Sequence, residues 1–228
     1  MWDKIHLVTL SMMFILLVSI YIFRRNLRPH RRIIYVSVAL MLLLSRISLD
    51  FWYVLTGSWD LRSSLPLELC SIASLLSAFM LLTRNKFLVE VLYFIAISGS
   101  LQALVTPELH FGFPQYRFLQ FFLDHFLLLL SPLLVIWLDK LKLKPFSIIK
   151  AWLFLNGLAI VVFILNYSFK ANYMFLMNKP STPSLLDYLG EHPFYLLSLE
   201  VIALILFIIL YLPISNKIDK EAKRSMTK

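Results

Sequence analysis

The chain contains a single cysteine among its 228 residues, so no disulfide can form within it. Charge is also scarce: only 15% of the residues are charged, whereas 60% are hydrophobic. A chain of this length cannot hide so much apolar surface inside one soluble core. The composition therefore excludes an ordinary soluble protein and indicates that most of the chain lies in lipid.

The sequence also lacks the alternating ten-residue segments of a membrane β-barrel, the other structure that can span a bilayer. It contains instead continuous apolar runs, and about 17–25 such residues can cross the hydrocarbon core as a helix. These runs predict an all-α, polytopic membrane protein that forms one domain over residues 1–228. The seven predicted transmembrane helices cover residues 5–23, 33–55, 65–83, 87–105, 118–138, 147–169 and 194–214.

The distribution of basic residues predicts the orientation of these helices. No small-residue cleavage site follows the first apolar run, so we interpret it as a retained helix. Most of the 22 Lys and Arg residues fall after the first, third, fifth and seventh helices. The positive-inside rule makes those segments cytoplasmic. We therefore expect an outside N-terminus and a basic cytoplasmic tail over residues 215–228, with the net charge of +9 setting topology and contacting anionic headgroups.

Several functional classes lack their usual signals. The basic residues form short loops rather than a folded basic face, so no nucleic-acid partner is expected. No ligand spacing such as H-E-x-x-H is present, and neither a metal nor a cofactor is expected. The last predicted helix has no lysine for a Schiff base, which argues against a rhodopsin-like photoreceptor. The expected partners are membrane lipids and a lipid or small-molecule substrate.

Ionisable residues inside the predicted helices are few. Each costs about 2.5–3.5 kcal/mol at mid-bilayer on the most lenient scale, so it needs a partner, a cavity or an interfacial position. Glu90 falls at a cytoplasmic helix end, where an ion pair with Arg84 or Lys86 explains it. The others all fall in the outer halves of their helices, and they are Arg46, Asp50, Glu68, Asp124, His125 and Glu200.

Some of these outer residues have structural as well as functional interpretations. Arg46 and Asp50 are spaced i, i+4 and can pair on one helix face. A packing salt bridge and the binding of a substrate headgroup both fit that pair. Glu200 fits equally a catalytic acid and a buried acid bonded to a neighbouring helix. Asn166 and Gln102, at a similar depth, are expected to form hydrogen bonds between helices.

Cys70 lies in the stretch "LPLELCS", at the start of the third predicted helix. Cys70, Ser74 and Ser77 share one helical face, whereas Glu68 points to nearly the opposite side. A buried cysteine is usually a small hydrophobe, but a histidine that takes its proton turns it into a nucleophile. His125, in "FFLDHFLL", has the same predicted depth and is either that base or a hydrogen-bonded residue of the bundle.

Three motifs resemble a known family. The stretch "NYMFLMNKPSTPSLLDYLGEHPFYLLSLE", preceded by "LPLELCSI" and "YRFLQFFLDHFLLLL", is similar to the bacterial YwaF-like integral membrane proteins. The resemblance covers residues 29–212. That family is distantly similar to the eukaryotic transmembrane protein 164 family, described as lipid acyltransferases that use a membrane cysteine and a histidine. Both likenesses imply a multi-pass protein, and the first implies a bacterial plasma membrane.

The resemblance also implies roles for individual residues. Cys70 matches the nucleophile and His125 the catalytic base. The chain departs from the bacterial family at one position near each of these residues. Glu68 stands two residues before the cysteine, where the family has a histidine, and Phe126 stands where a glycine commonly follows the later histidine.

We therefore expect a lipid acyltransferase that works at the outer leaflet through Cys70 and His125. The predicted substrate-binding residues are Arg46, Asp50, Glu68, Asp124 and Glu200. Two alternatives remain open from the residues alone. One is a transporter, solute-binding or sensing protein that uses an outward-facing polar cavity, although no internal repeat supports it. The other is an accessory membrane protein without an activity of its own.

Overall fold

The computed structural model describes residues 4–109, 111–180 and 185–226. Every regular element within those residues is a helix, which confirms the all-α prediction. In the same residues, six helical segments are long and apolar enough to cross a membrane. The long helices are α1 (Lys4–Ile22), α3 (Arg31–Leu55), α5 (Lys86–Val105), α6 (Tyr116–Asp139), α7 (Phe146–Phe169) and α8 (Phe194–Met226). The short ones are α2 (Arg24–Leu27), η1 (Arg28–His30), η2 (Tyr173–Phe175) and η3 (Leu185–Leu189).

The third predicted helix is shorter than expected. It is α4, which covers Leu69–Thr83 instead of residues 65–83. Pro66 has no backbone N–H and disfavours helical geometry in the residue before it, and Glu68 is extended, with ψ at 146°. With 15 residues, α4 is shorter than the about 20 that cross the hydrocarbon core. It packs among α3, α5 and α6 instead of facing lipid along a full span.

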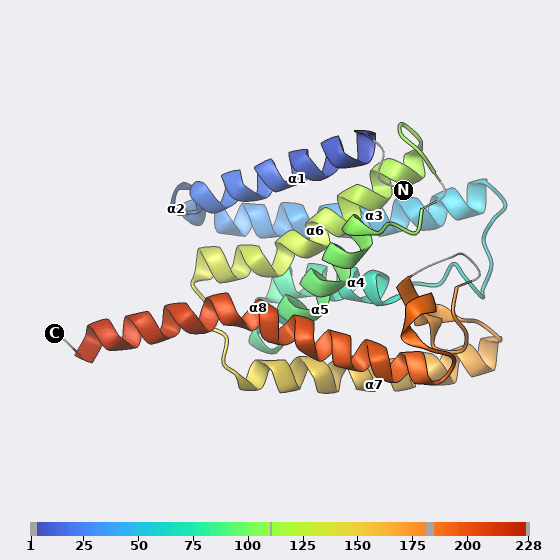
Figure 1. Cartoon of the computed structure of the whole chain (residues 1–228). Coiled ribbons are helices and arrows are strands. Elements are labelled where there is room, and N and C mark those ends of the chain that lie inside the picture. Colours follow the sequence, from blue (N-terminus) through green and yellow to red (C-terminus); the bar gives the residue numbers. More distant parts are fainter. Residues whose placement is uncertain (1–3, 110, 181–184, 227–228) are drawn as a thin grey trace.

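The connections between helices alternate between the two ends of the bundle, as the predicted order of helices requires (Figure 1). At one end, called the loop end here, lie residues 56–68, 106–109, 111–115, 170–180 and 185–193. At the other, called the basic end, lie residues 23–30, 84–85 and 140–145. The helices α4, α6 and α8 therefore all begin at the loop end. Beyond the predicted span, α8 continues as a helix to Met226.

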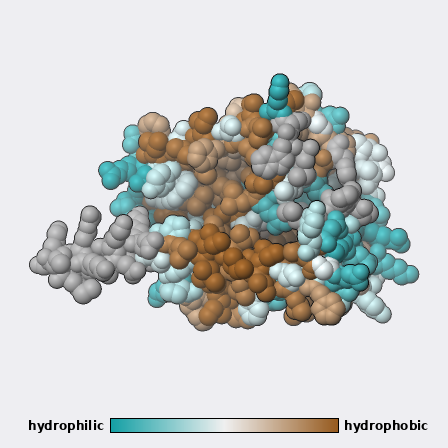
Figure 2. All heavy atoms as spheres, in the orientation of Figure 1, coloured by the Kyte–Doolittle hydropathy of each residue, from teal (hydrophilic) through white to brown (hydrophobic). Residues whose placement is uncertain are grey.

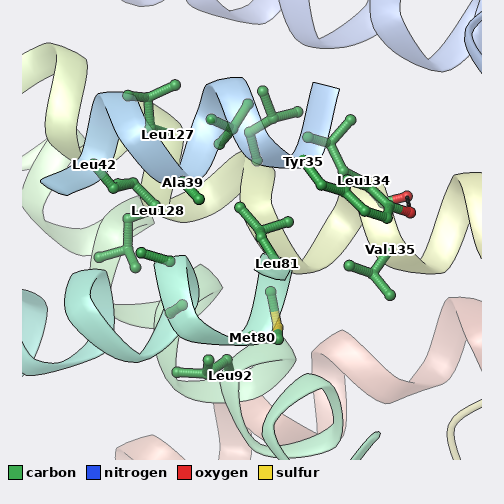
Figure 3. Close-up of a cluster of buried hydrophobic side chains, with 14 of the residues drawn as sticks. Tyr35, Ala39, Leu42, Met80, Leu81, Leu92, Leu127, Leu128, Leu134 and Val135 are labelled. Atoms are coloured by element: carbon green, nitrogen blue, oxygen red, sulfur yellow. Dashed lines mark hydrogen bonds between the residues drawn. The ribbon is translucent and has the colours of Figure 1, made fainter. Parts of the chain in front are cut away.

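The main core lies where α3, α4, α5 and α6 meet (Figure 3). Fully buried side chains from all four helices interlock there, among them Leu42, Leu81, Leu92 and Leu128. Lipid tails are as apolar as leucine, so close van der Waals packing, rather than removal from water, stabilises these contacts inside a membrane. The core holds α4 in place although α4 is short.

The outer helices expose their apolar side chains. Most of α5 and α6 is buried, whereas α1, α7 and the membrane-length part of α8 are largely exposed. Figure 2 shows apolar residues gathered in a band across the middle of one face, with polar residues toward both ends. Such a band matches the hydrocarbon core between two headgroup layers. The fold is that of a multi-pass membrane protein.

Glu90 forms its ion pair with a different partner from the one expected. Its buried carboxylate on α5 accepts a bond from the Lys150 ammonium of α7, at 2.5 Å. The predicted partners Arg84 and Lys86 are near Glu90 in sequence but do not pair with it. Because α5 packs against α7, the Glu90 face of α5 is turned toward Lys150.

Candidate functional site

Arg46 of α3 connects several segments near the loop end. Its side chain forms the predicted ion pair with Asp50, which confirms that pairing. The guanidinium also donates to the carbonyl oxygen of Ser64 at 2.7 Å and to the hydroxyl of Ser71 at 3.4 Å. Only 8% of Arg46 is exposed. Arg46 thus ties α3 to the start of α4, and its binding of a substrate headgroup stays a prediction.

Asp124 of α6 belongs to the same polar region. Its carboxylate accepts a bond from the Ser74 hydroxyl of α4, at 3.2 and 3.4 Å to the two oxygens. One turn earlier on α6, the Gln120 amide donates to the Ser45 hydroxyl of α3 at 3.1 Å. These bonds join three helices. We call this set the polar cluster, and its members are Ser45, Arg46, Ser71, Ser74, Gln120 and Asp124.

The polar cluster reaches the loop end through the first turn of α6. Arg117 donates to the Gln120 side chain, and its guanidinium lies 5.9 Å from the centre of the Trp52 ring. The Tyr116 hydroxyl donates to Ser48 of α3 at 2.7 Å. Polar side chains therefore line the contact between α3 and α6 from the loop end to Asp124.

Cys70 is the second residue of α4 and is half-buried. A Cβ atom on Gly99 of α5 would lie 3.7 Å from the Cys70 sulfur, so the thiol lies directly against the bare backbone of that glycine. Cys70 also packs against the apolar core. Cys70 also belongs to the first turn of α4, whose N–H groups have no acceptor four residues earlier within the helix. The thiol thus combines an apolar side with a polar helix end.

His125 lies in the middle of α6, with 9% of its surface exposed. Its Nδ1 atom is 2.8 Å from the Phe121 carbonyl oxygen. A carbonyl oxygen only accepts, so Nδ1 carries the proton, and the neutral ring keeps its lone pair on Nε2. Among the described residues, Nε2 has no hydrogen-bond partner, and no hydrogen bond joins His125 to Cys70. The ring also lies against that of Phe121, with centroids 4.2 Å apart.

Glu68, the residue before α4, holds a connecting segment rather than facing the polar cluster. Its carboxylate accepts a bond from the Met174 backbone N–H at 3.0 Å. Met174 belongs to residues 171–178, called the strap here, which follow α7. Apolar side chains of the strap pack against Leu67 and Ile72. The strap therefore covers the start of α4, close to Cys70.

Asn166 and Tyr173 anchor the strap. The Asn166 side chain, fully buried in α7, donates to the Tyr173 carbonyl and accepts from the Tyr173 N–H, both at 2.9 Å. The Tyr173 hydroxyl donates to the Leu61 carbonyl at 2.7 Å and accepts from the Leu65 N–H at 3.0 Å. Burial raises the pKa of Tyr173, so its hydroxyl stays protonated at neutral pH. The Asn166 amide does not join two membrane helices as predicted: it holds the strap, where Tyr173 begins the short helix η2.

Glu200 lies in a separate place, between α8 and α7. The Trp152 indole donates to its carboxylate at 2.6 Å and the Asn156 amide at 3.0 Å. Both partners belong to the half of α7 nearer the basic end. The expected position of Glu200 in the outer layer is therefore wrong: α8 begins deeper than the end of α7, which brings Glu200 toward the middle of the bundle. These two hydrogen bonds fit the interpretation of Glu200 as an acid bonded to a neighbouring helix.

The predicted residues thus fall into three groups rather than one cavity. Arg46 and Asp124 belong to the polar cluster, and Asp50 pairs with Arg46 beside it. Glu68 binds the strap, and Glu200 lies at the contact between α7 and α8. Within the described residues, no group of three or more His, Cys, Asp and Glu side chains is arranged to hold a metal ion. The roles of Gln120 and Ser74 were missed, although the spacing of Ser74 from Cys70 placed both on one face.

Ser77 offers a test of how the polar cluster stabilises the bundle. Its hydroxyl, fully buried in α4, is without a hydrogen-bond partner in the described part of the chain. Ser77→Ala removes an unsatisfied group, so the free energy of unfolding in detergent micelles should stay equal or rise. Ser74→Ala removes one of the hydroxyl donors to Asp124 and should lower the free energy of unfolding by about 1–2 kcal/mol. Equal losses in the two variants would contradict the assignment of Ser74 to the cluster.

Comparison with known proteins adds one match. The model of the TMEM164 family matches residues 1–211 of this chain. No curated protein and no solved structure matches it.

Proposed function

Because the chain belongs to the TMEM164 family of membrane proteins, we propose that it is a lipid acyltransferase with Cys70 as nucleophile and His125 as base. The observation that carries the proposal is the hydrogen bond between His125 Nδ1 and the Phe121 carbonyl. It leaves the Nε2 lone pair available to take a proton from a thiol or a hydroxyl. The proposal also includes the expected location in a bacterial plasma membrane.

The arrangement of α4 and α6 supports this pairing. Both helices begin at the loop end, and Ser74 of α4 meets Asp124 of α6. Cys70 lies one turn closer to the loop end than Ser74. Side chains in a helix point toward its N-terminus, and the bond to Phe121 pulls the His125 ring the same way, one turn toward the loop end. Thiol and imidazole therefore have similar depths on adjacent, parallel helices.

The proposed reaction has two steps. In the first, His125 Nε2 takes the thiol proton while the Cys70 sulfur attacks the ester carbonyl of a phospholipid. A C–S bond forms, the ester C–O bond breaks, and the lysophospholipid alkoxide leaves with the proton from His125. In the second, the hydroxyl of an acceptor lipid loses its proton to His125 and attacks the thioester, which restores the thiol. The first-turn N–H groups of α4 are suited to stabilise the negative oxygen in both steps.

The positive-inside rule assigns this chemistry to the outer leaflet. The loop end would face outward, so a lipid would enter from the side near the starts of α4 and α6. Arg46 and Asp124 would lie near its headgroup, although their bonds to protein groups also explain their burial.

The polar cluster favours a second candidate function, the movement of a small solute or a proton. Polar side chains continue from Arg117 through Gln120 to Asp124, and the unpaired hydroxyl of Ser77 lies two turns beyond Cys70 on α4. Buried ionisable residues of this kind mark transport paths in other membrane proteins. This candidate requires Asp124 but not the thiol.

Intact mass spectrometry of protein purified with native lipids tests the first candidate. The wild type should carry a fatty-acyl adduct that neutral hydroxylamine removes, because hydroxylamine cleaves thioesters. Cys70→Ala should carry none, whereas Ser77→Ala, a change on the same face of α4, should keep it. If the wild type carries no adduct even after incubation with added phospholipid, the proposed thioester intermediate is wrong, and the transport function is favoured instead.

A further inference from the structure

A cavity of about 470 Å³ opens beside the end of α7, next to the strap. We call it the α7 notch, and it is lined by Asn166, Tyr167, Lys170, Ala171, Met177 and Asn178. Its volume is within the range of about 300–1,000 Å³ that small-ligand sites occupy. None of the residues predicted from the sequence to bind substrate lines it.

The walls of the α7 notch are held in place by two asparagines. Asn166 fixes the strap to α7 through both of its bonds to the Tyr173 backbone. Within the strap, the Asn172 side chain accepts from the N–H groups of Met177 and Asn178 and donates to the Asn178 carbonyl at 2.8 Å. The backbone that carries Asn178 is therefore ordered by side-chain bonds, so the notch exists before a ligand enters.

Two hydrogen-bond donors at the notch have no protein partner among the described residues. In the described part of the chain, neither the Lys170 ammonium nor the Asn178 side-chain amide takes part in a hydrogen bond or an ion pair. An ammonium with three N–H groups and an amide with two are suited to an oxygen-rich anion. Ala171 and Met177 supply an apolar surface next to these donors.

The position of the notch along α7 indicates where such an anion comes from. Lys170 ends the apolar run of α7, and the Tyr167 ring, 77% exposed, lies one turn before it. Tyrosine and lysine at the end of a membrane helix lie at the level of the lipid headgroups. The group that offers oxygen acceptors next to apolar chains at this level is the phosphate of a phospholipid.

We propose that the α7 notch binds a phospholipid through its phosphate, with Lys170 and Asn178 as donors. The glycerol and the first methylenes of the acyl chains pack on Ala171, Met177 and the Tyr167 ring. The C-terminal dipole of α7 opposes an anion only weakly, because the Asn166 carbonyl at that end already accepts bonds from backbone N–H groups. The positive charge of Lys170 outweighs this opposition. The site is independent of acyl transfer, since none of its residues is assigned to that reaction.

The test measures lipid binding in the Cys70→Ala background, so that no acyl chemistry contributes. Purified protein in detergent is titrated with dihexanoylphosphatidylglycerol by isothermal calorimetry, and with inorganic phosphate in parallel. Lys170→Gln should weaken lipid binding about five- to tenfold, and Asn178→Ala about twofold to fivefold. Lys179→Gln is the matched control: it removes the same charge from the same loop, where the ammonium lies 5.8 Å from the Tyr195 ring centre.

Either of two outcomes would overturn the proposal. If Lys179→Gln weakens binding as much as Lys170→Gln does, only the general charge of the loop matters. If inorganic phosphate binds with the same affinity and the same dependence on Lys170, the occupant is a free anion rather than a lipid. Thermal unfolding of each variant is measured as well, and Asn178→Ala, a change at an exposed side chain, gives a second readout should Lys170→Gln fold poorly.

Discussion

Replacing His125 by asparagine is expected to slow the formation and turnover of the proposed acyl–Cys70 intermediate by about 10²–10⁴-fold. The asparagine amide can still donate to the Phe121 carbonyl, as Nδ1 does in the wild type. It has no basic atom in the place of Nε2, so the thiol of Cys70 keeps its proton. The rates are measured by single-turnover mass spectrometry with a fluorescent phospholipid.

A comparison of three variants separates chemistry from folding in that experiment. His125→Asn should unfold at nearly the wild-type temperature, whereas His125→Ala loses the bond to Phe121 as well and should be both slow and less stable. Ser168→Ala, at the exposed end of α7, should match the wild type in both respects. Wild-type acylation rates in a folded His125→Asn protein would rule out His125 as the base.

Replacing Asn166 by leucine should produce the largest loss of stability, about 2–4 kcal/mol. The change leaves the Tyr173 N–H without a partner, and an unpaired buried polar group costs about 1–3 kcal/mol. The Tyr173 carbonyl loses its shorter bond and keeps only the Leu176 N–H, at 3.4 Å. The strap should then loosen over the start of α4. Because the chain has one cysteine, the rate of maleimide labelling at Cys70 reports this loosening directly, alongside chemical denaturation for the free energy.

Asn166→Asp provides a graded control for that variant. It keeps the acceptor for the Tyr173 N–H and loses the donor to the Tyr173 carbonyl, so its effects should be intermediate. A change of labelling at Cys70 without any loss of stability, or the reverse, would show that the strap does not shield the start of α4.

The membrane helices could be predicted from the sequence because their signal is local. An apolar run of sufficient length must form a helix in lipid, where backbone groups find no water. The ends are less secure, as α4 shows: Pro66 and the bond that Glu68 forms with Met174 remove four residues from the predicted helix. That bond joins positions that are far apart in the sequence, so no local pattern predicts it.

The partners of the polar residues divide in the same way. The pairing of Arg46 with Asp50 follows from helical spacing alone, and the structure confirms it. The partners of Glu90, Asn166 and Glu200 depend on which helices are neighbours and on how deep each begins. Helix packing decides both, through side-chain shape rather than through residue type.

The sequence by itself determined that this chain is a bundle of membrane helices, because hydropathy and helical period act over short stretches. It also predicted a similar depth for Cys70 and His125. Only the tertiary structure decided that Ser74 meets Asp124, that the strap covers the start of α4, and that Lys170 and Asn178 share a notch. These contacts join segments that are distant in the chain. Their geometry depends on how whole helices pack against one another, which no short stretch of the sequence specifies.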